Sequence, residues 1–446
     1  MTMTPPDLSS PESALAWANE RFFVVNDGGK ALVCEEYFDR DFDRVVLRRM
    51  TFRDFEDLHQ HYALVLNGKA VPLGEFWLRN VHRRQYASII CDPSDNAETD
   101  AYNLWRGFNV DGAKTDGEWD LLREHLRVCI CRKDERLFEY HLNWFAWLVQ
   151  NPHRQAGVAL VWRGEQGSGK SMPARAIGSL FGPHFLTLTN PRHVTGNFNA
   201  HFENAVLVLL DEAFGTNDKA VQAAMKVLVT EPTLMMERKY QNAQPIRNRT
   251  HIIVCSNEDW VVPVGADDRR FCVVDVSDER RGQKDYFDAI DRQMESGGRE
   301  AMYCELLARD LSGFNIRDRP ETTALLEQKR YSQSDVEHWW EMKLRDERLL
   351  DAHDIGEWDD TPIEVFRAEM FEDYKQWLGR PSTSAHRQLG IRIRKLVPWL
   401  KDYVVDGQGV WKFPSLRDCR RFWDKRMKQK TDWPARVKDG ASWIVR

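Results

Sequence analysis

Residues 164–171 read Gly164-Glu165-Gln166-Gly167-Ser168-Gly169-Lys170-Ser171 and follow directly on the apolar run of residues 158–162. The spacing fits a phosphate-binding loop, in which glycines let backbone N–H groups close around a β-phosphate at the start of a helix. In such a loop the lysine reaches the β- and γ-phosphate oxygens, and the following serine holds Mg²⁺. We therefore expect ATP and Mg²⁺ as ligands. The residues expected to bind them are Gly164, Gly167, Ser168, Gly169, Lys170 and Ser171.

Four short apolar runs in the centre of the chain predict strands that are buried on both faces of a parallel sheet. Each consists mainly of β-branched and aliphatic residues without polar alternation, and segments of helical spacing separate the runs. They cover residues 158–162, 205–210, 252–255 and 271–276, and residues 185–188 add a candidate edge strand. The predicted fold class of this region is therefore α/β.

Polar residues end two of these runs. Asp211 and Glu212 close the second run, and Asn257 follows the third. Asp211 would bind Mg²⁺ through water and Glu212 would polarise the attacking water, because phosphoryl transfer depends on positioning and charge neutralisation. Asn257 would hydrogen-bond both the γ-phosphate and the lytic water. Together with the phosphate-binding loop, these residues predict an ATP hydrolase.

Arg269 and Arg270 lie directly before the fourth apolar run. One of them, with Arg270 as the first choice, is a candidate arginine finger for the γ-phosphate held by a neighbouring subunit. Such a residue raises hydrolysis by about 10³ or more. The alternative is a surface pair of arginines neutralised by Asp267 and Asp268.

The charge of the chain is unevenly distributed. The formal net charge of −6 argues against a uniformly basic nucleic-acid coat. From Pro381 to Arg446, however, there are 16 Lys and Arg against 6 Asp and Glu, so this tail carries +10 and the remainder −16. A basic module on an acidic body is typical of a local nucleic-acid contact. A solvated helical surface is the alternative interpretation of the same charge.

Neither the cysteines nor the apolar segments indicate export. The eight cysteines show no paired CxxC spacing, and we interpret them as reduced thiols. The first 13 residues lack a cationic start and an apolar stretch, and no window approaches 18 uninterrupted apolar residues. We expect a cytoplasmic protein that does not contact a membrane.

Composition and spacing divide the chain into five segments. Residues 1–118 predict an α+β region without chemistry of its own. Residues 119–155 have helical spacing and form either an oligomerisation collar or part of the core. Residues 156–280 are the ATPase core, and residues 281–360 predict a helical lid and linker. Residues 361–446 predict three helices and a hairpin, which suggests a small winged-helix-like domain.

The order of the motifs resembles a known family. All three motifs fall between Gly164 and Asn257: the phosphate-binding loop, the Asp-Glu pair and the Ser-Asn pair at the strand ends. This close spacing resembles that of the superfamily 3 helicases of viruses, phages and plasmids. Further stretches resemble the phage primase-helicase subgroup, and the likeness runs from about residue 102 to residue 278. They are Tyr102-Asn103-Leu104-Trp105-Arg106-Gly107-Phe108, residues 144–150, Gly196-x-Phe198-Asn199 and Asn257-x-x-Trp260-Val261-Val262-Pro263. The chain departs from the family at Cys255, where threonine is commoner.

The resemblance also implies a DNA contact. In this family a hairpin ahead of the asparagine-bearing strand projects into the channel of a hexamer and grips the phosphates of single-stranded DNA. The matching residues here are Arg238, Lys239 and Tyr240. By the resemblance Lys239 would bind a phosphate and Tyr240 a sugar or base, with Arg238 as a further candidate.

The resemblance implies an AAA+-like P-loop NTPase core in an ATP-dependent DNA helicase. By family analogy its subunits would form a ring, a hexamer, that translocates on single-stranded and forked DNA in a bacterial host, with polarity 3′ to 5′. Residues 1–119 lack the paired acidic motif of a primase-polymerase, so we expect no priming activity and a separate primase or polymerase as a partner. Two alternatives stay open: a nucleotide-controlled origin- or DNA-binding protein, and a non-unwinding remodelling ATPase.

Overall fold

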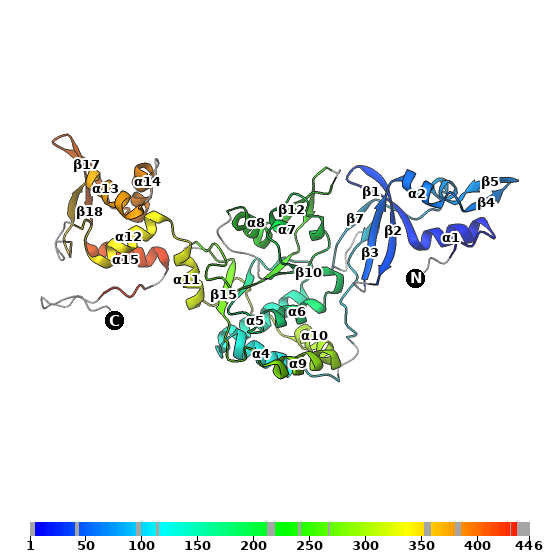
Figure 1. Ribbon diagram of the computed structural model, residues 1–446, viewed down its shortest axis with the longest axis horizontal. Helices are drawn as coiled ribbons and strands as arrows, with labels where there is room; N and C mark the ends of the chain where they lie inside the picture. The colour runs from blue at the N-terminus through cyan, green and yellow to red at the C-terminus, as the bar shows by residue number, and fades with distance from the viewer. Residues whose placement is uncertain are drawn as a thin grey trace. The chain divides into compact units, whose positions relative to one another are not determined.

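The chain forms two compact units, Met1–Val261 with Arg269–Thr322 and Val262–Asp268 with Thr323–Arg446 (Figure 1). The computed structural model describes residues 5–40, 44–94, 100–112, 116–211, 219–239, 242–265, 268–351, 358–379, 385–428 and 430–434. Among these residues, no helix has both the length and the apolar composition that a membrane crossing needs.

An α+β region opens the first unit, as the sequence predicts. Its main sheet has the strand order β3-β2-β1-β6, and the aromatic side chains of Phe22, Phe55 and Trp77 pack together beneath it. Thr51 and Asp54 form a reciprocal capping box that starts the second helix. The elements are α1 (Pro11–Arg21), β1 (Phe22–Asp27), β2 (Lys30–Asp39), β3 (Arg44–Met50), α2 (Phe52–His59), β4 (Ala63–Leu66), β5 (Lys69–Pro72), α3 (Leu73–Arg79), β6 (Gln85–Tyr86), β7 (Ser88–Ile90) and β8 (Ala101–Asn103).

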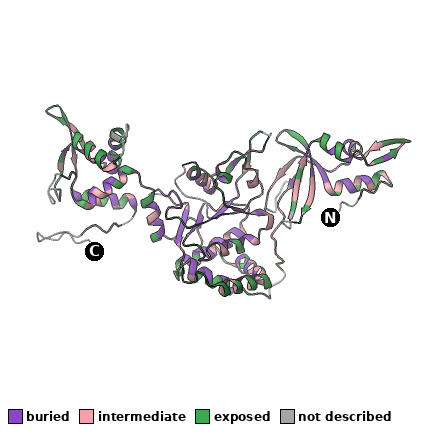
Figure 2. Cartoon of the chain, in the orientation of Figure 1, coloured by how far each residue is buried: buried purple, intermediate pink, exposed green. Residues whose placement is uncertain are grey.

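The central sheet of the first unit is parallel and has the strand order β10-β11-β14-β9-β15. Every residue of β11 and β14 is buried, which explains the absence of polar alternation in these strands (Figure 2). The four predicted strands are confirmed, and the candidate edge strand is indeed at the edge. The strands are β9 (Ala159–Arg163), β10 (Phe185–Leu188), β11 (Leu207–Asp211), β14 (His251–Ser256) and β15 (Phe271–Asp275).

Helices surround this sheet, and a separate antiparallel hairpin is formed by β12 and β13. Asp134 starts the long helix α5 by accepting hydrogen bonds from the backbone N–H groups of Arg136 and Leu137. The elements are α4 (Asp120–His125), the π-helical segment η1 (Leu126–Ile130), α5 (Glu135–Gln150), α6 (Ser171–Ser179), η2 (Gly182–His184), α7 (Arg192–Thr195), η3 (Ala200–Phe202), α8 (Lys219–Thr230), β12 (Thr233–Met236), β13 (Gln244–Arg247), α9 (Lys284–Gln293), η4 (Met294–Gly298) and α10 (Arg299–Ala308).

The aromatic residues of α5 are core residues. Trp144 is fully buried and its indole N–H donates to the Val158 carbonyl at 3.0 Å, while Phe145 lies edge-on to Trp162 of β9. The helix therefore packs on the sheet that carries the phosphate-binding loop. For residues 119–155, this packing favours the interpretation as part of the core over an oligomerisation collar.

The second unit holds the basic segment and a small three-stranded sheet of order β16-β18-β17. Its core contains several buried tryptophans, among them Trp340 and Trp358, whose rings lie 5.7 Å apart. Residues 363–366 form a strand, and the first of the three helices predicted for residues 361–446 begins at Arg367. The elements are α11 (Thr323–Tyr331), α12 (Asp335–Asp346), β16 (Ile363–Phe366), α13 (Arg367–Leu378), α14 (Ala385–Leu396), β17 (Lys401–Val405), β18 (Gln408–Phe413) and α15 (Leu416–Met427).

The division between the units falls at Thr322, inside the segment that the sequence assigned to one lid and linker. Helices α9 and α10 belong to the first unit, and α10 packs on α5. Helices α11 and α12 belong to the second unit. The predicted lid is thus divided between the two units.

Four of the five buried histidines of the first unit should make it sensitive to acid. Burial lowers the pKa of His125, His141, His184 and His251 to about 4, from an ordinary value of 6.5. Between these values the unfolded chain binds protons that the folded chain does not, so stability is lost as the pH falls. We expect each histidine to lower the free energy of unfolding by about 1.4 kcal/mol per pH unit in this window. Urea unfolding between about pH 7 and about pH 5 would measure it, and a constant stability would contradict it.

Candidate nucleotide site

The phosphate-binding loop connects β9 to α6. Gly167 and Gly169 have φ angles of +81° and +78°, which favour glycine, so the loop curls as the motif requires. The N–H of Gly164 donates to the Ser256 carbonyl at 3.0 Å and ties the loop to β14. Ser168 is fully buried, and its hydroxyl has no hydrogen-bond partner within the described part of the chain. A loop of this shape, with an unsatisfied hydroxyl, fits a bound anion.

Lys170 and Asn257 meet at the carboxyl edge of the sheet. The Lys170 ammonium donates to the Asn257 side-chain oxygen and lies 3.3 Å from the Glu165 carbonyl oxygen. Lys170 is 5% exposed, so its charge sits at the bottom of the loop and not on the surface. The two residues come together because β14, which ends just before Asn257, pairs directly with β9.

Asp211 lies on the other side of β14, at the end of β11. The residue is 6% exposed. Its carboxylate forms an ion pair with Arg175 of α6, with 2.8 Å between Arg175 Nη2 and Asp211 Oδ2. Lys170, Ser171, Arg175 and Asp211 line one cavity of about 440 Å³. The predicted catalytic residue Glu212 follows Asp211 and lies outside the described residues.

The far wall of this cavity was not predicted. It is formed by Phe287, Ile290 and Met294 of α9 and η4, with Asp291 and Glu295 among the charged lining residues. An apolar wall beside a phosphate-binding loop provides room for the base and sugar of a nucleotide. The sequence assigned these residues to the helical lid and linker of residues 281–360, but nothing in it indicated which helix face meets the loop.

His125 supports the phosphate-binding loop from below. One of its ring nitrogens, Nε2, lies 3.2 Å from the Gly169 carbonyl, and the other, Nδ1, lies 3.2 Å from the Tyr286 hydroxyl. Because a carbonyl only accepts, a neutral ring donates from Nε2 and accepts the tyrosine proton at Nδ1. A Cβ atom on Gly169 would lie 2.4 Å from Phe287 and 2.9 Å from His125. Only glycine fits at this position.

Arg269 and Arg270 lie at the amino-terminal ends of the strands, whereas the phosphate-binding loop lies at their carboxyl ends. The Arg270 carbonyl accepts a hydrogen bond from Ala159 N–H, at the start of β9, whereas Lys170 lies beyond its end. A strand of this length spans roughly 16 Å, further than an arginine side chain extends. Neither arginine can therefore reach the phosphate-binding loop of its own chain along this strand.

The hairpin implied by the resemblance is present. β12 and β13 pair in antiparallel register, with Met236 opposite Gln244. Lys239, between these strands in the chain, is exposed, whereas Tyr240 lies outside the described residues. The structure gives Arg238 other partners, because its guanidinium contacts Asp27 and Glu203. A DNA contact of these three residues stays a prediction.

Phe198 is an exposed aromatic residue next to the hairpin. The residue is 61% exposed, and the neighbouring Asn199 donates to the Met235 carbonyl and accepts from Glu237 N–H, both at 2.8 Å. The sequence marked Phe198 as part of the family signature but assigned it no role.

Comparison with known proteins agrees with this fold. A five-stranded parallel sheet with the glycine loop after its first strand is consistent with a P-loop NTPase core. Residues 162–270 match the model of a family described as a family of unknown function, DUF5906. The DNA primase-polymerase of Nitratiruptor phage NrS-1 is 29% identical over 185 residues, which are 41% of this chain and 26% of that protein. The match thus spans about a quarter of the relative's length.

Solved structures of the C-terminal region of the NrS-1 protein have the same fold. The alignment with one apo structure covers 92% of this chain and 100% of the chain in that structure, with a TM-score of 0.63 and 16% sequence identity. A second apo structure covers 90% of this chain and 98% of its own, with a TM-score of 0.62 and 15% identity. The predicted resemblance to phage primase-helicases is confirmed, and it lies with the C-terminal region of this relative.

Proposed function

We propose that this chain is an ATP-dependent DNA helicase that forms a ring, a hexamer by family analogy, and moves along single-stranded DNA during replication of a phage or other mobile element. One observation carries the proposal. Lys170, Asn257 and Asp211, from three neighbouring strand ends, converge at the edge of the sheet where the phosphate-binding loop lies. This convergence supplies the cation, the water-positioning amide and the carboxylate that ATP hydrolysis requires.

The donor set fits Mg²⁺. Within the described ranges there is no group of three or more His, Cys, Asp and Glu that could hold a metal by itself. Mg²⁺ in nucleotide sites does not need one, because it keeps several waters and takes its other ligands from phosphates and one or two protein oxygens. Ser171 would provide one such oxygen, and Asp211 would hold the ion through water. A Mg²⁺ ion held there would supply positive charge that offsets the negative charge of the phosphates.

The remaining residues act by position. The backbone N–H groups of residues 167–170 and the Lys170 ammonium would hold the phosphates, and Asn257 would orient the attacking water. Glu212, next to Asp211, would polarise that water. Arg269 and Arg270 lie at the far edge of the sheet, so an arginine finger of this chain would act on the site of a neighbouring subunit. This placement supports assembly into a ring.

A strand-displacement assay tests the proposal. Forked DNA with a 3′ tail or a 5′ tail is incubated with the purified chain, with and without ATP·Mg²⁺. We expect displacement only with ATP and on one type of tail, the 3′ tail by family analogy. Absence of ATP hydrolysis in every assembly state, or hydrolysis that DNA does not change in a protein that never forms a ring, would contradict the proposal.

The second unit favours an additional function, the binding of duplex DNA. Helix α13 packs on β16 and β18, helices α12 and α14 pack on α13 and on each other, and β17 and β18 form a hairpin, which supports the winged-helix interpretation. On α14, Arg387, Arg392 and Lys395 are exposed, and Leu389 and Ile393 are buried. The helix thus presents a basic outer face of the kind that enters a major groove.

Replacement of Arg387 and Lys395 by alanine tests this function. If both side chains contact phosphates, the double variant binds duplex DNA more weakly, and the slope of log affinity against log salt concentration falls by about 2. Fluorescence anisotropy over a range of salt concentrations measures both effects. Lys375→Ala is the control, because this exposed lysine lies on α13 and pairs with Glu372. An unchanged slope in the double variant would show that α14 does not bind the duplex.

A further inference from the structure

A closed ring of four alternating charges joins the N-terminal sheet to the hairpin. Arg49 of β3 lies 2.9 Å from Asp27 of β1 and 2.9 Å from Glu203, which follows η3. Arg238 of the hairpin connection lies 3.1 Å from Asp27 and also contacts Glu203. Each of the four groups therefore pairs with two partners of opposite charge, and the ring links three separate parts of the first unit.

The ring is shielded from solvent. The four side chains are between 7% and 19% exposed. Burial opposes the charged form of Arg49, but the carboxylates of Glu203 and Asp27 outweigh it and raise its pKa above the ordinary value. Charges removed from water are tolerated when each is paired, and removal of one partner leaves an uncompensated charge. The ring therefore favours a single arrangement of its members.

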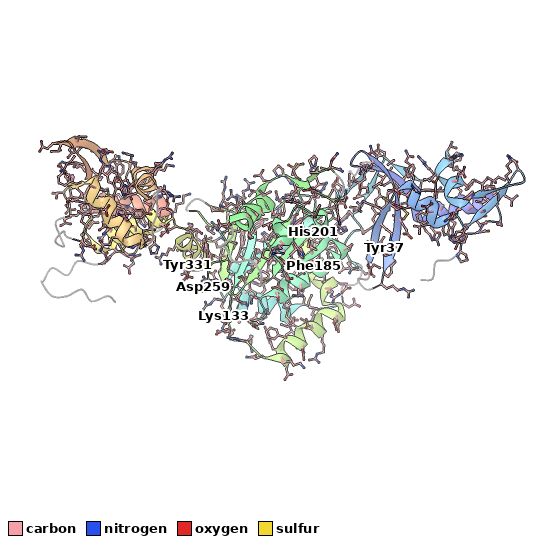
Figure 3. The ribbon with its side chains drawn as sticks, turned by 45° about the horizontal axis from the view of Figure 1, so that its top comes forward. Tyr37, Lys133, Phe185, His201, Asp259 and Tyr331 are labelled. Atoms are coloured by element: carbon pink, nitrogen blue, oxygen red, sulfur yellow. The ribbon has the colours of Figure 1, made fainter. Side chains whose placement is uncertain are left out.

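Two further contacts hold the hairpin beside the ring. Gly28, in the turn after β1, has a φ angle of +65°, and a Cβ atom there would lie 2.0 Å from the Gln244 side chain. Gln244 belongs to β13. On the other strand, Asn199 binds the backbone of Met235 in β12 and of Glu237 just after it. Both strands of the hairpin are thus in contact with residues outside it. Next to the ring, Arg49 and Glu203 line a cavity of about 230 Å³ together with Phe185 and His201, both labelled in Figure 3.

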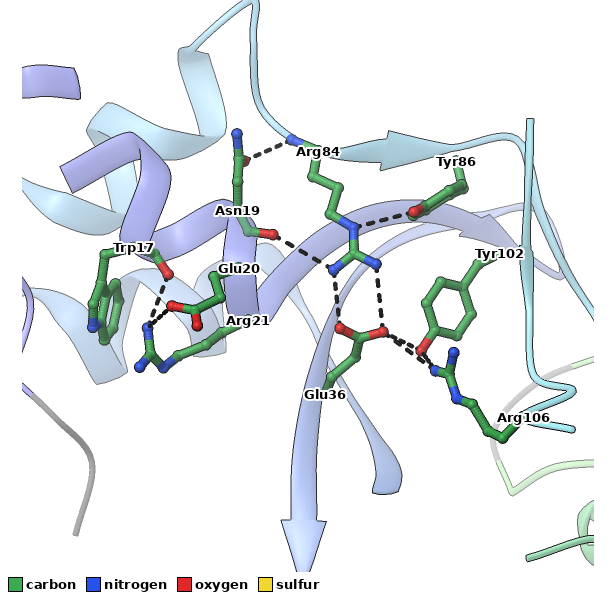
Figure 4. Close-up of polar contacts among 9 residues, drawn as sticks. All are labelled: Trp17, Asn19, Glu20, Arg21, Glu36, Arg84, Tyr86, Tyr102 and Arg106. Atoms are coloured by element: carbon green, nitrogen blue, oxygen red, sulfur yellow. Dashed lines mark hydrogen bonds and ion pairs between the residues drawn. The ribbon is translucent and has the colours of Figure 1, made fainter. Parts of the chain in front are cut away.

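The N-terminal sheet has other attachments that do not involve the hairpin. Glu36 pairs with Arg84 at 2.9 Å and with Arg106 at 3.3 Å, and it also accepts from the Tyr102 hydroxyl (Figure 4). The backbone N–H of Arg106 donates to His184 of the core at 3.1 Å. Because this network already fastens the sheet to the core, the charge ring is not the sole connection between them.

We propose that the N-terminal sheet is a positioning element for the DNA-binding hairpin, with Asp27, Arg49 and Glu203 as positioning residues that act through Arg238. The inference rests on the proposed function, since Lys239 is the residue expected to bind the phosphate. Lys239 follows Arg238 in the chain, so the ring fixes the backbone position from which the exposed Lys239 side chain extends. Movement of the hairpin along DNA would then have to carry the N-terminal sheet with it or open the ring.

Amide hydrogen exchange in the full chain tests the proposal. Asp27→Asn and Glu203→Gln keep the shape of each side chain but remove one charge from the ring. We expect exchange in residues 233–247 to rise about tenfold, with exchange in β9 unchanged. The stimulation of ATP hydrolysis by single-stranded DNA should be lost, whereas hydrolysis without DNA stays the same. The matched control is Glu35→Gln, which removes an ion pair with Arg48 on the same sheet without touching the hairpin.

Two results would overturn the proposal: unchanged hairpin exchange in both variants, or an equal rise in the hairpin and in β9, which would indicate general loosening. If either single variant does not fold, the double variant Asp27→Asn with Arg238→Gln retains the Arg49–Glu203 pair with balanced charge. Its hairpin exchange should also rise. The exchange measurement needs neither ATP nor unwinding, so a failure of the helicase proposal in the fork assay is distinguishable from a failure of this one.

Discussion

Subunits with Arg270→Ala should bind ATP with unchanged affinity and hydrolyse it about 10³-fold more slowly. Arg270 precedes β15, at the edge of the sheet opposite the phosphate-binding loop, and its carbonyl pairs with the first residue of β9. The side chain therefore cannot contribute to ATP binding in its own subunit. Its cation would stabilise charge on the γ-phosphate of a neighbour only during transfer, so the loss falls on the rate of hydrolysis.

Mixing experiments separate action between subunits from a local structural effect. Lys170→Ala subunits have no active loop but retain Arg270, and they should restore hydrolysis partly when mixed with Arg270→Ala subunits. Arg269→Ala is the comparison, because Arg269 is the neighbouring exposed arginine and the second candidate. Full hydrolysis by the Arg270→Ala protein, or by the parent protein diluted to monomers, would refute action in trans.

Lys239→Ala should lower the rate of unwinding about 100-fold or more and leave ATP hydrolysis without DNA unchanged. Lys239 is exposed in the connection between β12 and β13 and does not line the nucleotide cavity. Loss of its ammonium removes a charged contact to DNA phosphates without changing the groups that hold ATP. The expected result is an ATPase that no longer converts hydrolysis into movement along DNA.

The matched control is Lys133→Ala, another exposed lysine of the first unit, whose ion pair with Glu279 lies away from the hairpin. Fork displacement and ATP hydrolysis are measured for both variants at the same salt concentration. If Lys239→Ala unwinds as the parent does, the hairpin is not the moving contact. If it loses hydrolysis without DNA as well, the lysine serves the fold or the nucleotide site.

Local patterns were sufficient to predict the core. The strands β9, β11, β14 and β15 were predicted because burial on both faces of a parallel sheet requires uninterrupted apolar residues. The loop before α6 was predicted because its glycines are needed for φ angles that other residues avoid. Lys170 and Asn257 were each expected to act at the γ-phosphate, but their direct hydrogen bond was not predicted.

The partners of Arg238 had no local signal. Asp27 lies 211 residues away in the chain and Glu203 lies 35 residues away. A charged residue in a hairpin connection looks like a solvent-exposed group in any sequence pattern, and only the packing of the N-terminal sheet against the core buries it. The same holds for His125 and Phe287, which meet Gly169 only after distant helices pack on the phosphate-binding loop.

The sequence by itself determined the phosphate-binding loop, the order of the parallel strands along the chain and the basic character of the C-terminal segment. These features depend on the conformational freedom of glycine, on the burial of short apolar runs and on charge, all of which are local. Only the tertiary structure decided which arginine is sequestered in the ion ring, which helices close the nucleotide cavity and at which edge of the sheet Arg270 lies. Such contacts join residues far apart in the chain, and their free energy depends on burial and geometry that no single segment contains.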